Sequence, residues 1–301
     1  MTIRTASQTG IAKVTANAAK LGVGTYDNYL SIALGAGDTT VLKLVNAYAI
    51  LANHGREVKP TLIDYVQDRH GKVIYRTDNR CAVMDNCNAP DWNGRAMPRP
   101  PLRARQLLDP QAAYQMVHIL EGVVERGTAT VLRSLDRPLF GKTGTTSGPT
   151  NVWFVGGTPD VVAGVYIGYD QPRSMGRAAQ GGRIAAPVFK QWAETALKDM
   201  PKTPFIAPAG IRMVRIDRVS GRRVYGTFPI AEDPKSSVIW EAFQPETEPR
   251  RSFRRRSSEL AAVQAARPAA RPASRSAPRA APRDTGPADS GEFLQNQGGI
   301  Y

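Results

Sequence analysis

Residues 140–170 read FGKTGTTSGPTNVWFVGGTPDVVAGVYIGYD, and this stretch guides the interpretation of the rest of the chain. Three apolar, β-branched runs are separated by short turns rich in glycine, proline and aspartate, such as GTPD at 157–160. Short separators favour antiparallel neighbours, because parallel strands need crossovers of a dozen or more residues. The stretch therefore predicts an antiparallel meander of three strands.

The GKTGTT run within this stretch carries its chemistry. On a strand, alternation places Lys142 and Gly144 on one face. Thr143 and Thr145 then lie on the other face, unless the glycine permits a bulge that lets them converge. A cation beside two hydroxyls suits a carboxylate, and an edge strand offers backbone groups to an extended peptide. The run thus predicts recognition of a peptide-like acid, with a backbone amide available to stabilise an oxyanion.

A nucleotide site is excluded by the residues before this run. GKT also ends the phosphate-binding loop G-x-x-x-x-G-K-[ST], which needs a glycine five positions before Gly141. Asp136 stands there instead, and its carboxylate would repel phosphate groups.

Helical periodicity dominates the first 55 residues. TGIAKVTANAAKLG has apolar residues on one helical face and stops at Gly22. GDTTVLKLVNAYAILANHG predicts a further helix with Asp38 or Thr39 as its N-cap and Gly55 beyond its end.

Two more helices flank the meander. LDPQAAYQMVHILEGVVERGTAT predicts a helix capped by Asp109 and started by Pro110. AAPVFKQWAETALKDM predicts another, with Val188, Trp192 and Leu197 facing inward. His118, in the first of these, is interpreted as a hydrogen-bonded histidine of the helix surface rather than a catalytic base.

Two hairpins are predicted outside the meander. Residues 58–77 alternate around RHGK, and residues 210–226 alternate around Ser220 and Gly221. Between the first hairpin and the next helix, residues 78–105 are rich in proline, asparagine and arginine without a period, which indicates an irregular excursion. It contains Cys81 and Cys87, for which a loop disulfide and two free thiols are equally compatible with the spacing.

The charge of the chain is concentrated near its C-terminus. The net charge is +14, but residues 250–283 hold ten arginines against one acid. The Arg, Pro, Ala and Ser composition of residues 246–301 predicts a disordered tail, which suits weak contact with an anionic polymer or lipid rather than a specific nucleic-acid site. Three scattered histidines predict no metal site, and no signal peptide or membrane span is present in the sequence.

Several segments together resemble one known family. K-T-G-[ST] on a strand is the third signature of the penicillin-recognising serine acyl-enzymes, beside S-x-x-K and S-x-N. LGAGDTTVLKLVNAYAILANHG, GVVERGTAT and GGRIAAPVFKQW look like the transpeptidase domain of class A bifunctional penicillin-binding proteins of the 1A type. The resemblance covers residues 2–245. It implies an α+β fold of the penicillin-binding and serine β-lactamase-like kind, here partial, in which an antiparallel sheet and helices accompany a helical subdomain.

The resemblance also implies a mechanism and a site. In that family a serine attacks the D-Ala-D-Ala bond of a peptidoglycan stem peptide, and the acyl group passes to an amine of a neighbouring strand. β-Lactams acylate the same serine, and no cofactor or metal is implied. By motif, Lys142 sets the electrostatics, while the Thr143 and Thr145 hydroxyls bind the terminal carboxylate. Gly144 allows close approach, and the Thr145 N–H forms half of the oxyanion hole.

The other two signatures are absent from these 301 residues. No serine has a lysine three positions on, and no S-x-N occurs. Tyr26-Asp27-Asn28 and Thr77-Asp78-Asn79 mimic the second signature and are interpreted as loops. A smaller departure is Asn151, where the family often carries an acidic residue.

Both absent motifs precede segments like MTIRTASQTGIAKV in the family, so residues 1–245 resemble the C-terminal part of the transpeptidase domain of a longer enzyme. The N-terminal part of that domain, a glycosyltransferase domain and a membrane anchor at the periplasmic face of the bacterial inner membrane would lie outside this sequence. We expect that the chain alone neither cross-links peptidoglycan nor reacts with penicillin. The alternative is a non-catalytic truncated module that binds wall peptide or a partner.

Overall fold

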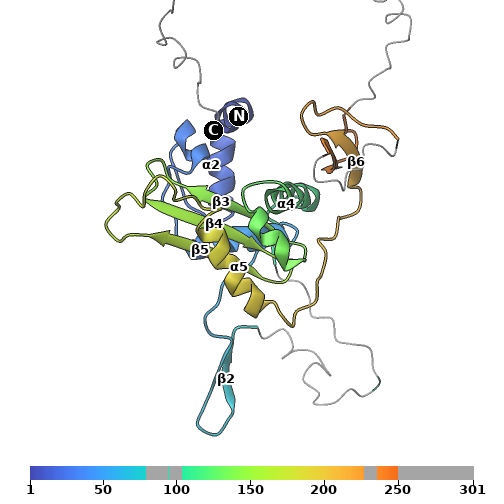
Figure 1. Ribbon diagram of the computed structural model, residues 1–301. Helices are drawn as coiled ribbons and strands as arrows, with labels where there is room; N and C mark the ends of the chain where they lie inside the picture. The colour runs from blue at the N-terminus through green and yellow to red at the C-terminus, as the bar shows by residue number, and fades with distance from the viewer. Residues whose placement is uncertain (79–93, 95–103, 227–235, 250–301) are drawn as a thin grey trace, which may run out of the picture. The chain divides into compact units, whose positions relative to one another are not determined.

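The computed structural model of the protein describes residues 1–78, 94, 104–226 and 236–249. These residues belong to the unit Met1–Ser252 (Figure 1). Most of the predicted excursion at 78–105, both cysteines and nearly all of the predicted tail at 246–301 lie outside the described residues. The helical elements are α1 Thr2–Thr9, α2 Ile11–Lys20, η1 Leu30–Leu34, α3 Val41–Ala52, α4 Pro110–Glu125, η3 Thr130–Leu135 and α5 Ala185–Ala196. The strands are β1 Tyr65–Gln67, β2 Val73–Arg76, β3 Phe140–Thr145, β4 Asn151–Gly157, β5 Val162–Gly168, β6 Arg212–Asp217 and β7 Val238–Phe243.

The predicted meander is confirmed. β3, β4 and β5 form a three-stranded sheet in that order, with both pairings antiparallel. The register from Phe140 opposite Gly157 to Thr145 opposite Val152 runs without a bulge. Strict alternation therefore holds along β3, and its odd and even residues face opposite sides of the sheet.

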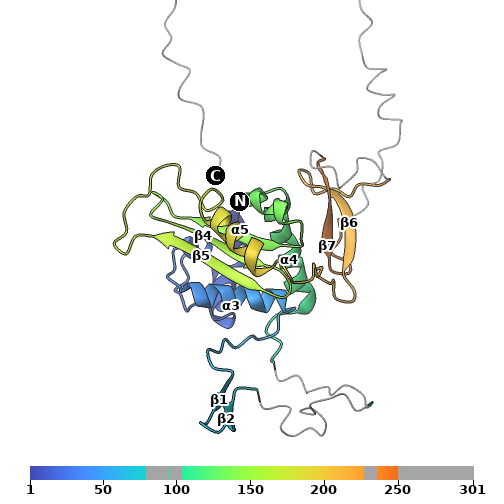
Figure 2. The same cartoon turned by 60° about the horizontal axis from the view of Figure 1, so that its bottom comes forward.

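Helices cover both faces of this sheet (Figure 2). On one face the Phe154 ring lies 4.7 Å from the Phe189 ring of α5. On the other face Phe140 packs against Val117 and Leu120 of α4, and its ring lies 5.8 Å from that of Tyr48 in α3. The sheet thus divides the buried core into two layers, and β3 contacts both α4 and β4.

The interpretation of α5 was wrong by one row of residues. Val188 and Trp192 are 44% and 39% exposed, although both were expected to face inward, whereas Leu197 is buried as expected. Phe189 and Ala193 face the sheet instead. Ala185 and Ala186 are also on the buried side of α5, and such small side chains let a helix lie near strands. The Trp192 ring packs against the Phe189 ring at a centroid distance of 5.3 Å.

The capping predictions had mixed outcomes. Asp109 caps α4 as predicted, because its carboxylate accepts a hydrogen bond from the Ala112 N–H at 2.9 Å. The cap of α3 is neither Asp38 nor Thr39 but Thr40, whose hydroxyl accepts from the Lys43 N–H at 3.2 Å. The Thr39 side chain instead turns to the Val23 carbonyl, to which its hydroxyl donates at 2.8 Å.

The two predicted hairpins also differ in outcome. β1 and β2 pair as expected, with every residue exposed. Residues 210–226 only partly form a hairpin, through the bridge of Ile216 with Arg223, and β6 pairs along its length with β7. β7 offers the longer pairing, from Arg212 opposite Phe243 to Asp217 opposite Val238, and its Val238 and Ala242 are buried. In the part of the chain that the structure describes, no helix is long and apolar enough to cross a membrane.

Candidate functional site

β3 presents a free edge for hydrogen bonding on the side away from β4. The Thr146 N–H donates to the Asn151 carbonyl at 3.3 Å, so residues 146 and 151 form a hydrogen-bonded pair. In an antiparallel ladder such pairs alternate with pairs that are not bonded. The backbone N–H and C=O groups of Thr143 and Thr145 therefore point away from β4. Among the described residues no strand pairs with this edge.

Lys142 reaches this edge from the face of the sheet that α4 covers. Its Nζ donates a hydrogen bond to the Thr143 carbonyl at 2.9 Å. Lys142 as a residue is exposed, yet its amine end lies close enough to the protein that burial lowers its pKa. The Lys142 side chain thus bends to the outer edge of β3, and no bulge brings the lysine and the threonine hydroxyls onto one face.

The two threonine hydroxyls lie on the opposite face, as alternation predicts. The Thr143 hydroxyl is 2.6 Å from the Thr128 hydroxyl, which belongs to the turn after α4. The Thr145 hydroxyl accepts a hydrogen bond from the Gly181 N–H at 3.0 Å, just before α5. Each hydroxyl is therefore held by a different segment of the chain.

The glycines around these hydroxyls are required by close packing. A Cβ on Gly181 would lie 2.6 Å from the carbonyl oxygens of Gly144 and Trp153. A Cβ on Gly182 would lie 2.2 Å from the Thr128 carbonyl oxygen. Since backbone atoms cannot yield to such contacts, only glycine lets this segment lie directly on β3.

Sequence reasoning assigned no site role to Thr128 or Gly181. Both belong to segments that carried the family resemblance, GVVERGTAT and GGRIAAPVFKQW. The small-residue pairs in those segments were the available signal, because they mark places where backbones meet. Contact with β3 could not be read from the sequence, since 15 and 36 positions separate the bonded partners.

The Asn151 position fits the local structure. Its Oδ1 accepts a hydrogen bond from the Trp153 indole N–H at 3.0 Å. The Thr146 hydroxyl accepts from the Thr150 and Asn151 N–H groups at 3.0 and 3.1 Å, which closes the turn after β3. An amide oxygen therefore serves as the acceptor where the family often has a carboxylate.

The loop interpretation of the Tyr26-Asp27-Asn28 triplet agrees with its contacts. The Asn28 side chain accepts a hydrogen bond from the Thr15 hydroxyl at 2.6 Å, and the Tyr26 hydroxyl donates to the Asp38 carbonyl at 2.8 Å. The second triplet ends at Asn79, which lies outside the described residues.

Both ring nitrogens of His118 have hydrogen-bond partners within the fold. Its Nδ1 lies 3.3 Å from a Glu121 oxygen, and its Nε2 lies 3.0 Å from the Trp240 carbonyl. Within the described ranges, no three His, Cys, Asp or Glu side chains are grouped so that they could hold a metal ion.

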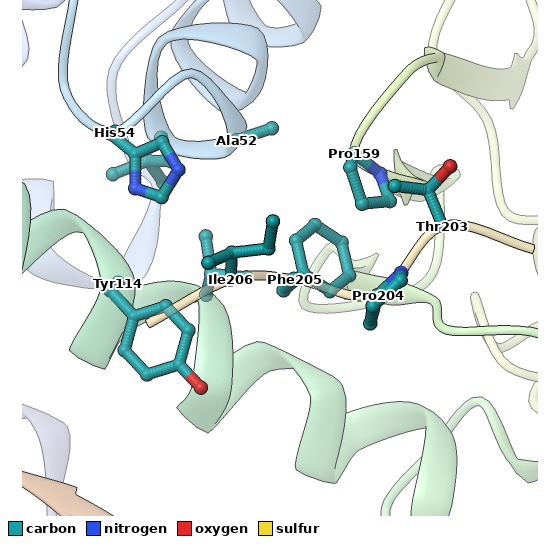
Figure 3. Close-up of a pocket in the computed structure, with 10 residues that line it drawn as sticks. Ala52, His54, Tyr114, Pro159, Thr203, Pro204, Phe205 and Ile206 are labelled. Carbon is teal, nitrogen blue, oxygen red and sulfur yellow. The ribbon is translucent and has the colours of Figure 1, made fainter. Parts of the chain in front are cut away.

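A small cavity lies away from the threonines (Figure 3). Its volume is about 100 Å³, well below the roughly 300 Å³ at which ligand pockets begin. It is lined by Leu51, Ala52, His54, Tyr114, Val117, Pro159, Thr203, Pro204, Phe205 and Ile206. The Phe205 ring of the cavity lies 5.3 Å from the ring of Phe140, the first residue of β3. The candidate site is at the other end of this strand, near Thr145. The exposed edge of β3 is therefore the better candidate.

Comparison with known proteins identifies the family. The family described as the penicillin binding protein transpeptidase domain matches residues 6–194. Penicillin-binding protein 1A of Rickettsia prowazekii is 34% identical over 245 residues, which is 81% of this chain and 30% of that protein. Its counterpart in Neisseria flavescens is 42% identical over 183 residues, which is 60% of this chain and 21% of that protein. The chain thus spans less than a third of the length of these relatives.

Solved structures agree at the level of the fold. The crystal structure of penicillin-binding protein 1A from Haemophilus influenzae superposes with a TM-score of 0.67 at 24% identity, covering 84% of this chain and 39% of that one. The penicillin-binding protein PonA1 from Mycobacterium tuberculosis gives a TM-score of 0.51 at 22% identity, over 64% of this chain and 51% of that one. Mixed helices on an antiparallel sheet, a KTGT strand at its edge and a family match over well over half the residues lead to one conclusion. The chain belongs to the penicillin-binding protein transpeptidase domain family.

Proposed function

We propose that this chain forms one wall of a peptidoglycan D,D-transpeptidase site, built to hold the D-Ala-D-Ala end of a stem peptide or a β-lactam. The observation that carries the proposal is the outer edge of β3. There the Lys142 ammonium, two fixed threonine hydroxyls and an outward-facing backbone N–H lie within four consecutive residues. An extended peptide with a free carboxylate matches that arrangement, because it needs backbone partners along its length and cationic or hydroxyl donors at its end.

Each group has a distinct role in this proposal. The Thr143 and Thr145 hydroxyls donate to the ligand carboxylate. The Lys142 charge lies at the same edge and favours an anionic ligand there, while its lowered pKa brings the neutral form nearer to physiological pH. Gly144 keeps the strand surface open to the ligand backbone. The Thr145 N–H provides one oxyanion donor, and removing one such donor typically costs about 3 to 4 kcal/mol of barrier lowering.

The nucleophile must come from outside these 301 residues. Transpeptidation of this type forms an ester between a serine oxygen and the penultimate D-Ala carbonyl carbon, and releases the terminal D-Ala. An amine of a second strand then displaces the serine. The sequence holds no S-x-x-K to supply that serine. We therefore propose that the chain acts together with the N-terminal part of its own domain, in a longer enzyme at the periplasmic face of the inner membrane that also polymerises glycan strands.

The absent signature favours a second candidate. The chain alone would be a non-catalytic module that binds wall peptide or a partner without turnover. Both candidates share the ligand wall, and they differ in whether a serine is supplied. In neither candidate is the chain by itself acylated by the ligand.

Labelling with a fluorescent penicillin tests the inactivity of the chain. Purified protein is incubated with the reagent, denatured and resolved on a gel, with a known penicillin-binding enzyme as the positive control. We expect no covalent band from the 301-residue chain. A stable band would show that a serine of this sequence is the nucleophile and would overturn that part of the proposal.

Ligand binding tests the wall itself. We expect N-acetyl-D-Ala-D-Ala as the free acid to shift the amide resonances of residues 142–145, and its C-terminal amide to bind more weakly. Lys142→Met keeps the length of the side chain and removes its charge, so it should weaken binding of the acid about fivefold or more and leave the amide unchanged. Equal binding of acid and amide to the wild-type chain would refute carboxylate recognition at this edge.

A further inference from the structure

The Thr143 hydroxyl has a polar partner in the turn that follows α4. The Thr128 and Thr143 oxygens are 2.6 Å apart, a normal distance between two hydroxyls. Thr128 is exposed and Thr143 is half-buried, so solvent or a ligand can reach the pair. No described residue other than Thr128 bonds to the Thr143 hydroxyl.

The backbone of Thr128 is held in place on both sides. The next residue, Ala129, is fully buried, and its N–H donates to the Val123 carbonyl at 3.0 Å. Gly182 packs so closely on the Thr128 carbonyl that no side chain fits between them. The Thr128 hydroxyl therefore approaches β3 from a fixed direction.

A pair of hydroxyls shares its protons in one of two ways. Each hydroxyl carries one proton and two acceptor lone pairs. If Thr143 donates to Thr128, the Thr143 proton is used and cannot reach a ligand. If Thr128 donates, the Thr143 proton is free. A carboxylate only accepts hydrogen bonds, so a carboxylate bound at Thr143 selects the second arrangement.

Thr145 shows the same logic with a fixed donor. Its hydroxyl accepts a hydrogen bond from the Gly181 N–H, and a backbone N–H can only donate. The Thr145 proton is therefore directed elsewhere. The two hydroxyls of β3 are thus each supported by one group from a neighbouring segment, and Thr128 is the support that side-chain substitution can remove.

We propose that Thr128 is a positioning residue of this site: its hydroxyl donates to Thr143 and so directs the Thr143 proton toward the carboxylate of the bound peptide. The inference rests on the proposed function, which it deepens by adding a residue that does not touch the ligand. Thr128 sets the rotamer of Thr143 before binding, so less order has to be created when the ligand arrives.

Three variants separate positioning from general effects on the fold. Thr128→Val keeps the β-branched shape and removes the hydroxyl, whereas Thr128→Ser keeps the hydroxyl. Thr130→Val is the matched control, because Thr130 is exposed two residues further on, at the start of η3. The probes are N-acetyl-D-Ala-D-Ala as the free acid and as the C-terminal amide, titrated into the full 301-residue chain by NMR.

We expect Thr128→Val to weaken binding of the free acid about fivefold, the cost of ordering one side chain on binding, because the Thr143 hydroxyl remains but is no longer held in place. Binding of the amide should change less than twofold. Thr128→Ser should restore acid binding to within about twofold of wild type, and Thr130→Val should match wild type. An equal loss for acid and amide, or no loss for either, would overturn the proposal.

A measurement without ligand keeps this test independent of the proposed function. Three-bond couplings report the χ1 rotamer of Thr143, which should be single in the wild type and averaged in Thr128→Val. A single rotamer in both proteins would overturn the positioning role whatever the ligand does. If the wild type does not distinguish acid from amide while the rotamer responds, the proposed ligand is wrong and the Thr128 contact is right.

Discussion

Gly156 shows how a single residue permits the pairing that creates the site. It lies opposite Gly141 in the β3–β4 ladder. A Cβ on Gly156 would come 2.1 Å from the Phe140 carbonyl oxygen and 2.6 Å from the Gly141 Cα. Both are backbone atoms, so the strand would have to shift to make room for a side chain.

Gly156→Ala should therefore lower the free energy of unfolding by about 1 to 3 kcal/mol, the usual cost of overpacking. Urea denaturation followed by circular dichroism measures this loss. Ser147→Ala, an exposed substitution in the turn after β3, is the control and should stay within about 0.5 kcal/mol of wild type. A Gly156→Ala protein as stable as the control would mean that the two strands are farther apart than described.

At the scale of elements, one histidine contributes a titratable link to the contact of α4 with β7. His118 of α4 is bonded to Glu121 on its own helix and to the Trp240 carbonyl on β7, with a Glu241 oxygen 3.9 Å from Nε2. The Tyr114 ring stacks beside it. Burial opposes the charged form, but the hydrogen bonds and the two carboxylates outweigh it and raise the pKa of His118.

This raised pKa predicts how stability depends on pH. The unfolded chain has an ordinary histidine pKa of about 6.5, so the folded state binds the proton more tightly. The contribution of His118 to stability is fully present below about pH 6.5. It is lost as the pH rises through the pKa that His118 has in the folded state. As the pH rises from 6 to 8, the unfolding temperature of the wild type should fall more steeply than that of His118→Gln.

The titration of the His118 ring protons provides the direct measurement. Its midpoint should lie above that of histidine in an unfolded peptide. A midpoint at or below the peptide value, or the same pH dependence of unfolding in both proteins, would contradict the role of this cluster. Glutamine is the suitable replacement because it can still donate to the Trp240 carbonyl without titrating.

The whole molecule has an uneven distribution of charge. Of a net charge of +14, residues 250–283 supply ten arginines against a single acid. This charge lies beyond the family match, which ends at residue 194, and beyond β7. The boundary predicted near residue 245 and the role of the basic segment stay predictions.

A chain shortened to end at residue 249 should lose weak, salt-sensitive binding to vesicles that contain phosphatidylglycerol, because each basic residue near an anionic surface contributes about 1 kcal/mol. Cosedimentation of both chains with anionic and with zwitterionic vesicles measures this. The full chain should bind only the anionic vesicles, and less as salt rises. Equal binding by the shortened chain would place the affinity in residues 1–249.

Much of the secondary structure followed from local chemistry. Alternation and short turns predicted β3, β4 and β5, and Asp109 with Pro110 marked the start of α4. Local rules failed where two choices were almost equal in the sequence. Thr39 and Thr40 are both good caps, and in the fold Thr40 caps α3 while Thr39 donates to the distant Val23 carbonyl. The sheet that α5 covers decides which row of its residues is buried. The periodicity of the helix alone does not show which row that is.

The KTGT strand, the faces of its residues and the absence of S-x-x-K all follow from the order of residues, because they depend on neighbours along the chain. Which groups support the threonines depends on how the elements pack. Thr128 and Gly181 reach Thr143 and Thr145 only because α4, β3 and α5 pack together, and glycines allow their backbones to touch. Such contacts depend on distance in space, which periodicity and composition do not encode.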